Sequence, residues 1–269
     1  MRIDVSIIVP VFNTGKVAKG LVEKILKDDY CRLEIILVDD GSTDDSLDTL
    51  KKIKDKRVKI YHQGNCGPSA ARNFGIDKSC GRYLMFIDSD DDIDDSFIVK
   101  MLDEVKKEDV ALAVSGVKYR KLWKKTEDDV YLDVFSYDKG EGNMGLVLRC
   151  LLHDGRMYPA FNKIFEARVI KENNIRFDES MKFGEDTKFV LDYLKCASGK
   201  IRFILEPLYT YNAGTPTSTA KKMERDWKNW KKCFKNLKKW VGSGASLKEK
   251  RLLILIYLKW RASWLKSRL

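Results

Sequence analysis

The sequence predicts an α/β fold built on a doubly wound, mostly parallel sheet, and two patterns indicate this class. Short, continuous apolar runs recur through the first 118 residues, as expected for strands that are buried on both faces of a parallel sheet. Helical stretches separate these runs, and repeated strand–helix–strand units imply right-handed crossovers. Ligands bind such sheets at the carboxyl ends of the strands, so we expect functional residues where the apolar runs end.

Five strands and four helices account for this part of the chain. The expected strands are Val5–Val9, Leu33–Val38, Val58–Tyr61, Tyr83–Ile87 and 110–118. Three of the expected helices are 16–27, Pro68–Ile76 and 96–107. The fourth follows the second strand and has Asp44 and Asp45 in its first turn. Proline suits the first position of a helix, and Ser42 or Thr43 can cap the helix that follows the second strand.

The remainder of the chain is less regular. Residues 119–157 are polar, contain glycine and show little periodicity, so we expect an insertion over the site with one helix near 144–153. Residues 158–212 return to mixed structure, with a helix around 185–197 and a strand near 201–205.

Composition and cysteine usage limit the class of protein. A chain of 269 residues with 44% hydrophobic and 34% charged residues can bury a substantial core. No secretory signal opens it, and no apolar run approaches the roughly 20 residues that span a bilayer. Six cysteines lie scattered without a C-x-x-C pair, which favours reduced thiols over disulfides or a zinc site. We therefore expect a cytoplasmic enzyme or binding protein.

Positive charge is concentrated in the last 49 residues. Residues 221–269 contain 16 lysines and arginines but three acids, whereas the whole chain has a net charge of +11. The preceding 220 residues are thus close to neutral. This distribution argues against a nucleic-acid-binding protein and for a local attachment surface.

Two acidic clusters follow predicted strands that we expect to be adjacent in the sheet. Asp39 and Asp40 end one strand, and Asp88 and Asp90 follow another. Carboxylates gathered in one crevice repel each other unless a cation lies among them. Mg²⁺ or Mn²⁺ bridging a diphosphate fits, because Mg²⁺ typically takes one or two carboxylates together with phosphate oxygens. The neighbouring acids of 91–95 are expected to solvate the loop and cap the next helix.

A third acidic pair lies far along the chain. Glu185 and Asp186 follow a glycine and open an otherwise apolar helix. Displacement of a diphosphate at a sugar carbon benefits from a carboxylate base on the opposite face, and this pair is the candidate. The alternative is that both acids only favour the positive end of their helix.

These motifs together resemble family 2 glycosyltransferases. The resemblance covers about residues 3–220 and runs through five segments in the order of that family. They are VSIIVPVFN at 5–13, LVDDGSTD at 37–44, GNCGPSAARNFGI at 64–76, FIDSDD at 86–91 and Glu185-Asp186. The resemblance implies a GT-A fold, inversion at the sugar carbon and a nucleoside-diphosphate donor, usually a UDP-sugar.

The same resemblance assigns roles to single residues. It implies that Pro10, Val11 and Asp39 line the uridine pocket, and that Asp40, Arg72 and Ser89 lie on the nucleotide side. Asp88 would hold the ribose or a metal-linked water, and Asp90 would coordinate the divalent cation. Asp186 would be the general base, oriented by Glu185. Asn162 and Lys163 resemble the segment on the acceptor side.

One segment departs from the family pattern. Members commonly follow the last core strand with Tyr-Arg or Tyr-His and then a serine, whereas this chain has Tyr211-Asn212. Tyr211 and Ser218 could still bind phosphate, but the third metal ligand is missing from the pattern. Neither histidine, His62 nor His153, is placed to supply it, and both are interpreted as surface or packing residues.

The basic tail is interpreted as two amphipathic helices broken at Gly242-Ser243-Gly244. One apolar stripe consists of Met223, Trp227, Trp230, Phe234, Leu237 and Val241. Tryptophan with lysine and arginine on such helices is typical of an interfacial anchor on an anionic membrane. The alternative is that the stripe packs on the body of the protein or on a second copy.

The expected division is therefore a catalytic domain at 1–220, with a nucleotide-binding half at 1–118 and an acceptor-side half at 119–220, followed by the tail at 221–269. The expected activity is transfer to a glycan or lipid-linked acceptor in surface polysaccharide synthesis, at the inner face of the cell membrane. Two alternatives remain. One is a sugar-phosphate nucleotidylyltransferase, which would need a glycine-rich basic loop after the first strand. The other is a non-catalytic membrane scaffold, which would not need Asp39, Asp88, Asp90 and Asp186.

Overall fold

The computed structural model describes residues 3–27, 32–121, 130–131, 143–153, 157–213 and 227–266. Its strands are β1 (Val5–Val11), β2 (Leu33–Asp40), β3 (Val58–Gln63), β4 (Tyr83–Phe86), β5 (Asp92–Ile93), β6 (Val110–Lys121), β7 (Val130–Tyr131), β8 (Lys163–Glu166) and β9 (Lys200–Ala213). Its helices are α1 (Gly15–Ile25), α2 (Ser46–Leu50), α3 (Pro68–Lys78), α4 (Phe97–Val105), α5 (Asn143–His153), α6 (Ala167–Glu172), α7 (Glu185–Cys196), α9 (Trp227–Val241) and α10 (Leu247–Lys266).

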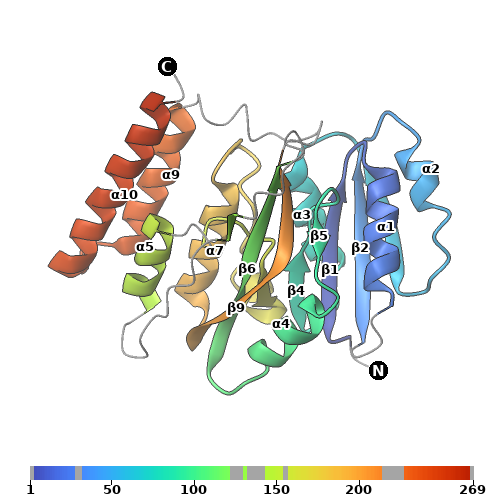
Figure 1. Ribbon diagram of the computed structural model, residues 1–269, viewed down its shortest axis with the longest axis horizontal. Helices are drawn as coiled ribbons and strands as arrows, with labels where there is room; N and C mark the ends of the chain where they lie inside the picture. The colour runs from blue at the N-terminus through green and yellow to red at the C-terminus, as the bar shows by residue number, and fades with distance from the viewer. Residues whose placement is uncertain are drawn as a thin grey trace.

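The strands form one mixed, curled sheet with the order β3-β2-β1-β4-β8-β6-β9-β5, and β7 pairs with β6. β1, β2, β3 and β4 are parallel, as are β6 and β9, while β8, β5 and β7 pair antiparallel. The predicted α/β fold with a mostly parallel sheet is confirmed (Figure 1).

Successive side chains of each strand point to opposite faces of the sheet, and this creates two hydrophobic cores, one on each face. In β1, Ile7 and Val9 are buried in the core beneath α1 and α4, whereas Ile8 points into the core beneath α3 and α7. This two-sided burial explains the continuous apolar runs in the sequence, because a strand covered by helices on both faces has no solvent-facing positions.

Two sequence-based expectations about the first half are wrong. β1 lies between β2 and β4, so the two acidic clusters end strands that are not adjacent. α2 begins at Ser46 after Asp45, and neither Ser42 nor Thr43 caps it. Instead, Ser42 Oγ accepts a hydrogen bond from the backbone N–H of Asn13, and the Thr43 N–H donates to the Asn13 side chain. The two loops at the carboxyl ends of β1 and β2 are thereby tied together.

Both predicted tail helices form, and a turn at Gly242 separates them. They stand side by side at the end of the molecule that is remote from α1 and α2 (Figure 1). Leu237, Val241 and Ile256 are buried in the same core as α7, as the alternative interpretation of the tail expected. The tail therefore packs against the 1–220 region, and the boundary at residue 220 stays a prediction.

Candidate functional site

Arg72 on α3 lies at the centre of the site. Its Nη2 is 2.5 Å from Asp88 Oδ1 at the end of β4, and its Nη1 is 3.3 Å from Asp186 Oδ1 on α7. The Arg72 residue is 5% exposed. One buried guanidinium thus joins the acid that follows β4 to the acid that opens α7, which are 98 residues apart in the chain.

Burial controls the protonation of the acids at this point. It raises the pKa of Asp186, while Arg72 opposes the rise by favouring the charged carboxylate. Burial and the nearby charge of Asp186 raise the pKa of Glu185 to about 7. Burial alone would lower the pKa of Arg72, but Asp88 and Asp186 raise it overall, so the guanidinium stays charged. Asp186 is the better-placed candidate for a base, because its carboxylate pairs directly with Arg72.

A buried carboxylate shapes the loop that follows β4. Asp91 accepts hydrogen bonds from the Tyr209 hydroxyl at 2.7 Å and from the Asn212 N–H at 2.8 Å, and burial raises its pKa. The Asn212 side chain donates to the Asp90 carbonyl at 2.8 Å, and the Asp88 N–H donates to the Tyr209 hydroxyl at 3.2 Å. β9 therefore fixes the backbone from Asp88 to Asp91. Asp91 is a structural residue here and does more than solvate the loop.

The same loop is tied to the other side of the site by Ser89. Its hydroxyl lies 2.7 Å from the Thr14 hydroxyl, just before α1. Among the described residues, no group of three His, Cys, Asp or Glu side chains could hold a metal ion by itself. The loop offers Asp90 with Asp88, which matches the one or two carboxylates by which a protein holds Mg²⁺ together with substrate phosphates.

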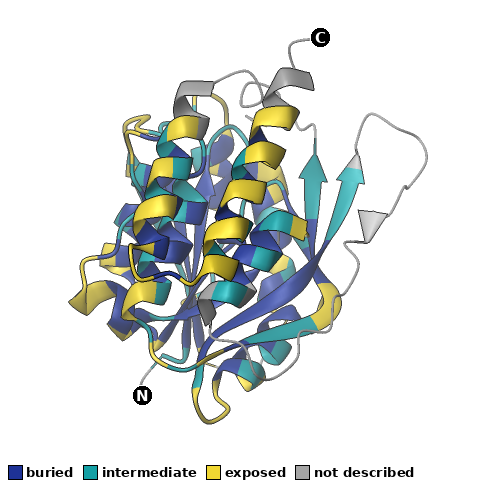
Figure 2. Ribbon diagram, turned by 90° about the vertical axis from the view of Figure 1, so that its left-hand side faces the viewer, coloured by how far each residue is buried: buried dark blue, intermediate teal, exposed yellow. Residues whose placement is uncertain are grey.

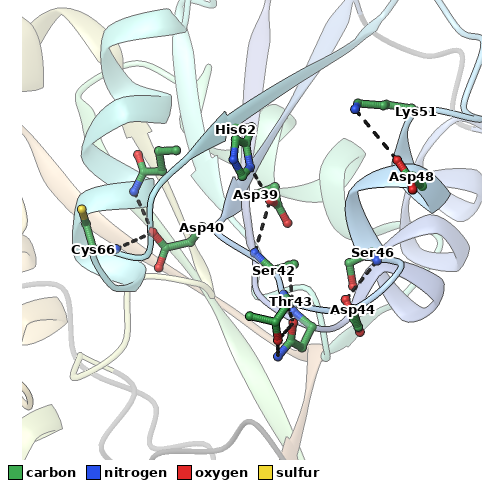
Figure 3. Close-up of polar contacts among 12 residues, drawn as sticks. Asp39, Asp40, Ser42, Thr43, Asp44, Ser46, Asp48, Lys51, His62 and Cys66 are labelled. Atoms are coloured by element: carbon green, nitrogen blue, oxygen red, sulfur yellow. Dashed lines mark hydrogen bonds and ion pairs between the residues drawn. The ribbon is translucent and has the colours of Figure 1, made fainter.

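The carboxyl end of β2 provides a second acidic position. Asp39 Oδ2 lies 2.7 Å from His62 Nδ1 on β3 and accepts a hydrogen bond from the Ser42 N–H at 3.3 Å (Figure 3). Asp39 Oδ1 is buried and has no hydrogen-bond partner among the described residues. Val11, paired with Asp39 across β1 and β2, and Pro10 lie directly beside it. An acceptor held in place by a histidine, with one oxygen unused, suits an N–H donor of a ligand.

Asp40 points to the other side of β2 and has a different task. Its Oδ1 accepts hydrogen bonds from the Cys66 N–H at 2.9 Å (Figure 3) and from Gln63 Nε2 at 2.8 Å. Its Oδ2 accepts a hydrogen bond from the Gly67 N–H at 2.8 Å. Gly67 has φ +92°, a conformation that favours glycine. Both oxygens of Asp40 thus hold the turn that leads into α3, and so they place Arg72.

The residues expected on the acceptor side are buried. Asn162 and Lys163 are both 0% exposed, and Lys163 Nζ donates to the Pro159 carbonyl at 2.6 Å and to Asn162 Oδ1 at 2.8 Å. They support the segment whose Ala160 N–H donates to Asp186 Oδ2 at 3.2 Å. Because both side chains are buried, neither lies at a surface where an acceptor could contact it.

Tyr211 and Ser218 were the two side chains expected to bind phosphate near the end of the last strand. Tyr211 is half-buried, with its ring 5.7 Å from Phe161 and 5.6 Å from Tyr119. Ser218 lies outside the described residues. Asn212, which stands where a cation was expected, is a backbone-fixing residue for the Asp90 loop.

Three residues that shape the candidate site were missed or misinterpreted from the sequence. His62 was interpreted as a surface or packing residue, but its position opposite Asp39 in the β2–β3 register places it on Asp39 Oδ2, beside the candidate ligand oxygen Oδ1. The alternation of β3 could have revealed this. Tyr209 and Asn212 reach the Asp88–Asp91 loop through a contact between strands more than 115 residues apart, and no local pattern signals it.

Comparison with known proteins adds independent information. Residues 6–172 match the family model described as glycosyl transferase family 2. The chain is 29% identical over 231 residues to the glycosyltransferase GlyG of Streptococcus pneumoniae serotype 4, covering 83% of this chain and 75% of that protein. It is 26% identical over 209 residues to the uncharacterized glycosyltransferase EpsJ of Bacillus subtilis, covering 77% of this chain and 60% of EpsJ.

Solved structures show the same fold. S. aureus TarS superposes with a TM-score of 0.71 at 22% identity, covering 97% of this chain and 72% of that one. TarS structures with UDP and with UDP-GlcNAc have TM-scores of 0.66 and 0.64. The mannosyltransferase PcManGT of Pyrobaculum calidifontis, in complex with GDP-Man and Mn²⁺, has a TM-score of 0.67 at 12% identity and covers 100% of this chain and 74% of that one.

Proposed function

Because the chain belongs to glycosyl transferase family 2, we propose that it is an inverting enzyme that transfers a sugar from a UDP-sugar to an acceptor hydroxyl. The observation that carries the proposal is the pairing of Asp186 with Arg72. It places an ionisable carboxylate at the start of α7 beside the acidic loop after β4.

In the proposed reaction, Asp186 Oδ accepts the proton of the acceptor hydroxyl as that oxygen attacks the sugar carbon. Attack on the face opposite the diphosphate inverts the configuration, since the displacement is a single step. Arg72 favours the ionised form of the base and holds its carboxylate in one orientation, and the Ala160 N–H restricts the second oxygen. Glu185 lies next to the base, and burial and the charge of Asp186 raise its pKa to about 7, so it can carry a proton at neutral pH.

Divalent-cation dependence is part of the proposal, supported by the donor set and by the Mn²⁺ complex of PcManGT. Asp90 and Asp88 would hold Mg²⁺ or Mn²⁺, and the cation would neutralise charge on the departing diphosphate. Asn212 would serve this step by holding the Asp90 backbone in place, and Tyr209 by holding that of Asp88. Asp39, whose Oδ1 has no partner in the part of the chain that the structure describes, is the proposed acceptor for the imide N–H of uracil.

Donor class can be tested by isothermal titration with UDP and GDP, each with and without Mn²⁺. We expect UDP to bind only with metal, and Asp90→Ala to abolish that binding. Asp95→Ala is the matched control, because its carboxylate is 88% exposed on the same loop and pairs with Lys24. Metal-dependent binding of GDP without UDP would reject the uridine assignment. Absence of binding to either nucleotide would revive the non-catalytic scaffold, which the family match does not favour.

We further propose a lipid-linked acceptor in surface polysaccharide synthesis at the inner face of the cell membrane, and an exposed apolar surface on α10 supports this part of the proposal. Leu247, Ile254, Leu255 and Leu258 are 78%, 58%, 48% and 51% exposed and share one face of the helix. Exposed basic side chains flank them, namely Lys248, Lys250, Arg251, Lys259 and Arg261. Figure 2 shows the exposed faces of α9 and α10 together on one side of the molecule. None of the helices in the described ranges is long and apolar enough to cross a bilayer.

This surface is proposed to lie on anionic lipid, because apolar side chains with basic flanks bind acidic headgroups. Sedimentation with vesicles of phosphatidylglycerol and phosphatidylcholine tests it. Leu255→Glu/Leu258→Glu should lower the bound fraction, whereas Leu205→Glu, at a 52% exposed position on β9, should not. Unchanged binding in the double variant would contradict the proposal. A shift from dimer to monomer without loss of vesicle binding would assign the face to a second copy.

A further inference from the structure

The C-terminal helices contact the start of α7, which is where the proposed base lies. Gly184, with φ +76°, is the residue immediately before Glu185 and Asp186. A Cβ atom at Gly184 would lie 2.7 Å from Cys233 Sγ on α9. The backbone that leads into the acidic pair thus rests directly on α9, and Cys233 is 4% exposed at this contact.

α9 also holds the segment that precedes Gly184. Lys232 Nζ donates to Ser180 Oγ at 2.7 Å and lies 3.6 Å from Asp178 Oδ2. Asn236 Nδ2 lies 3.7 Å from Met181 Sδ. These contacts restrict residues 178–181, from which the chain turns into α7.

α10 reaches the base from the opposite side, through the segment 157–160. Trp260 Nε1 donates to the Tyr158 hydroxyl at 2.8 Å, and that hydroxyl donates to the Leu151 carbonyl on α5. The Tyr158 carbonyl accepts a hydrogen bond from Thr187 Oγ1 at 3.2 Å. Two residues later, the Ala160 N–H donates to Asp186 Oδ2 at 3.2 Å. Trp260 is therefore linked to the Asp186 carboxylate through one short segment of backbone.

We propose that α9 and α10 are positioning elements for the base: they hold the first turn of α7 and the 157–160 segment so that Asp186 stays against Arg72. This inference rests on the role of Asp186 in the proposed function. The tail is then not a separable anchor, because its inner face supports the site while its outer face is available to a membrane. Deleting residues 222–269 would uncover the core beneath α7 and would not leave an intact catalytic domain.

The geometry predicts an effect on turnover more than on donor binding. Trp260 and Tyr158 lie on the side of the site that holds the proposed base. Asp39, at the end of β2, and Asp90, in the loop after β4, lie on the proposed nucleotide side. Misplacement of a reacting group by about 1 Å can lower a rate by about 100-fold. Loss of one supporting hydrogen bond is therefore expected to lower kcat while the KM for donor and the Kd for UDP stay close to those of the wild type.

Trp260→Phe is the primary test, because it removes the indole N–H and keeps an aromatic ring in the core. Trp240→Phe is the matched control: Trp240 lies in the same helix pair, is 9% exposed, and makes no side-chain hydrogen bond with any residue in the described part of the chain. Hydrolysis of the UDP-sugar, UDP titration and thermal unfolding are measured on the full chain. We expect Trp260→Phe to lower kcat about 10-fold, with KM and the Kd for UDP within twofold of the wild type. Trp240→Phe should keep its kcat.

Tyr158→Phe provides a second variant and closes a double-mutant cycle with Trp260→Phe. The double variant should lose little beyond Tyr158→Phe alone, because both changes remove the same hydrogen bond. Unchanged kcat in both single variants would overturn the positioning role, and so would an equal fall of kcat in Trp240→Phe. Wild-type protein that neither binds UDP nor turns over any UDP-sugar would overturn the proposed function and this inference together.

Discussion

Arg72 Nη1 lies 3.3 Å from Asp186 Oδ1, so a residue of α3 controls the charge of a carboxylate on α7. The same guanidinium holds Asp88 through Nη2. The two nitrogens of one planar group are used in two directions, which a lysine cannot reproduce because its charge lies on a single nitrogen. The arrangement joins the metal-side loop to the proposed base, and it makes Arg72 sensitive even to a conservative change.

Arg72→Lys is expected to retain the fold and lose at least 10-fold in kcat, because one of the two carboxylates loses its partner. Arg72→Met should lower the free energy of unfolding by up to about 3 kcal/mol, since it leaves two partly buried carboxylates without a cation. Urea unfolding and UDP-sugar hydrolysis measure the two effects. Wild-type kcat in Arg72→Lys would show that the ion pair with Asp186 does not control the base.

His62→Ala is expected to weaken UDP binding without changing the melting temperature by more than a few degrees. His62 is half exposed and orients Asp39, whose other oxygen is proposed to meet uracil. We expect the Kd for UDP to rise about 10-fold, a loss that corresponds to about 1.4 kcal/mol. His153→Ala, on α5, is the control. Equal Kd values for His62→Ala and wild type would separate Asp39 from nucleotide recognition.

Asn212→Asp tests whether β9 fixes the Asp90 loop. The substitution keeps the shape but replaces the N–H₂ donor to the Asp90 carbonyl with an acceptor, and it adds a charge close to Asp91. We expect metal-dependent UDP binding to weaken about 10-fold, measured by titration at several Mn²⁺ concentrations. Binding that is unchanged at every Mn²⁺ concentration would contradict a fixing role for Asn212.

A pH effect on stability is expected at Glu34, away from the site. Burial alone would raise the pKa of Glu34, but hydrogen bonds from Lys59, Ser6 and the Cys80 N–H lower it to about 2. A carboxyl with a lowered pKa stabilises the fold above its unfolded value of about 4.5, and this contribution is lost as pH falls towards 2. The contribution is roughly 3 kcal/mol at neutral pH.

Urea unfolding between pH 7 and pH 2.5, for wild type and Glu34→Gln, measures this contribution. The difference in the free energy of unfolding between the two should shrink as the pH falls below 4.5, because the Glu34 carboxyl of the unfolded wild type takes up a proton there while the folded form does not until about pH 2. A difference that stays constant over this range would show that Glu34 is not held as a carboxylate.

Thiol reactivity reports the docking of the tail. Burial raises the pKa of Cys233 to about 12, and the negative charge of Glu185 contributes, so the thiolate is scarce at neutral pH. Cys66, Cys80 and Cys196 are exposed. A variant with these three and Cys31, which lies outside the described residues, changed to serine retains only the buried Cys150 and Cys233 and should react slowly with a thiol reagent. Addition of Trp260→Phe should speed labelling of Cys233. Equal labelling rates with and without Trp260→Phe would contradict an effect of Trp260 on docking.

The fold was largely predictable, because strands buried on both faces and glycine or aspartate at their carboxyl ends leave a local pattern. Asp39 and Asp88 could be placed at one edge of the sheet for this reason. The order of the strands was not predictable, and β1 separates these two residues. Contacts such as Cys233 against Gly184 depend on how helices dock over long separations, which no local periodicity encodes.

The helical tail illustrates the same limit. Its apolar stripe was visible in the sequence, but the buried side of α9 includes Cys233 and Trp240 as well as Leu237 and Val241, so the stripe is rotated from the expected one. An amphipathic pattern indicates that a face is covered and does not say by what. Here the core beneath α7 covers it.

The most direct test of the proposed activity is hydrolysis of UDP-sugars by wild type and Asp186→Asn, with UDP titration of both proteins. We predict that Asp186→Asn lowers kcat by at least about 100-fold, as expected for loss of a general base, while its Kd for UDP stays within twofold of wild type. Wild-type kcat in Asp186→Asn would contradict the assignment of Asp186 and with it the proposed reaction.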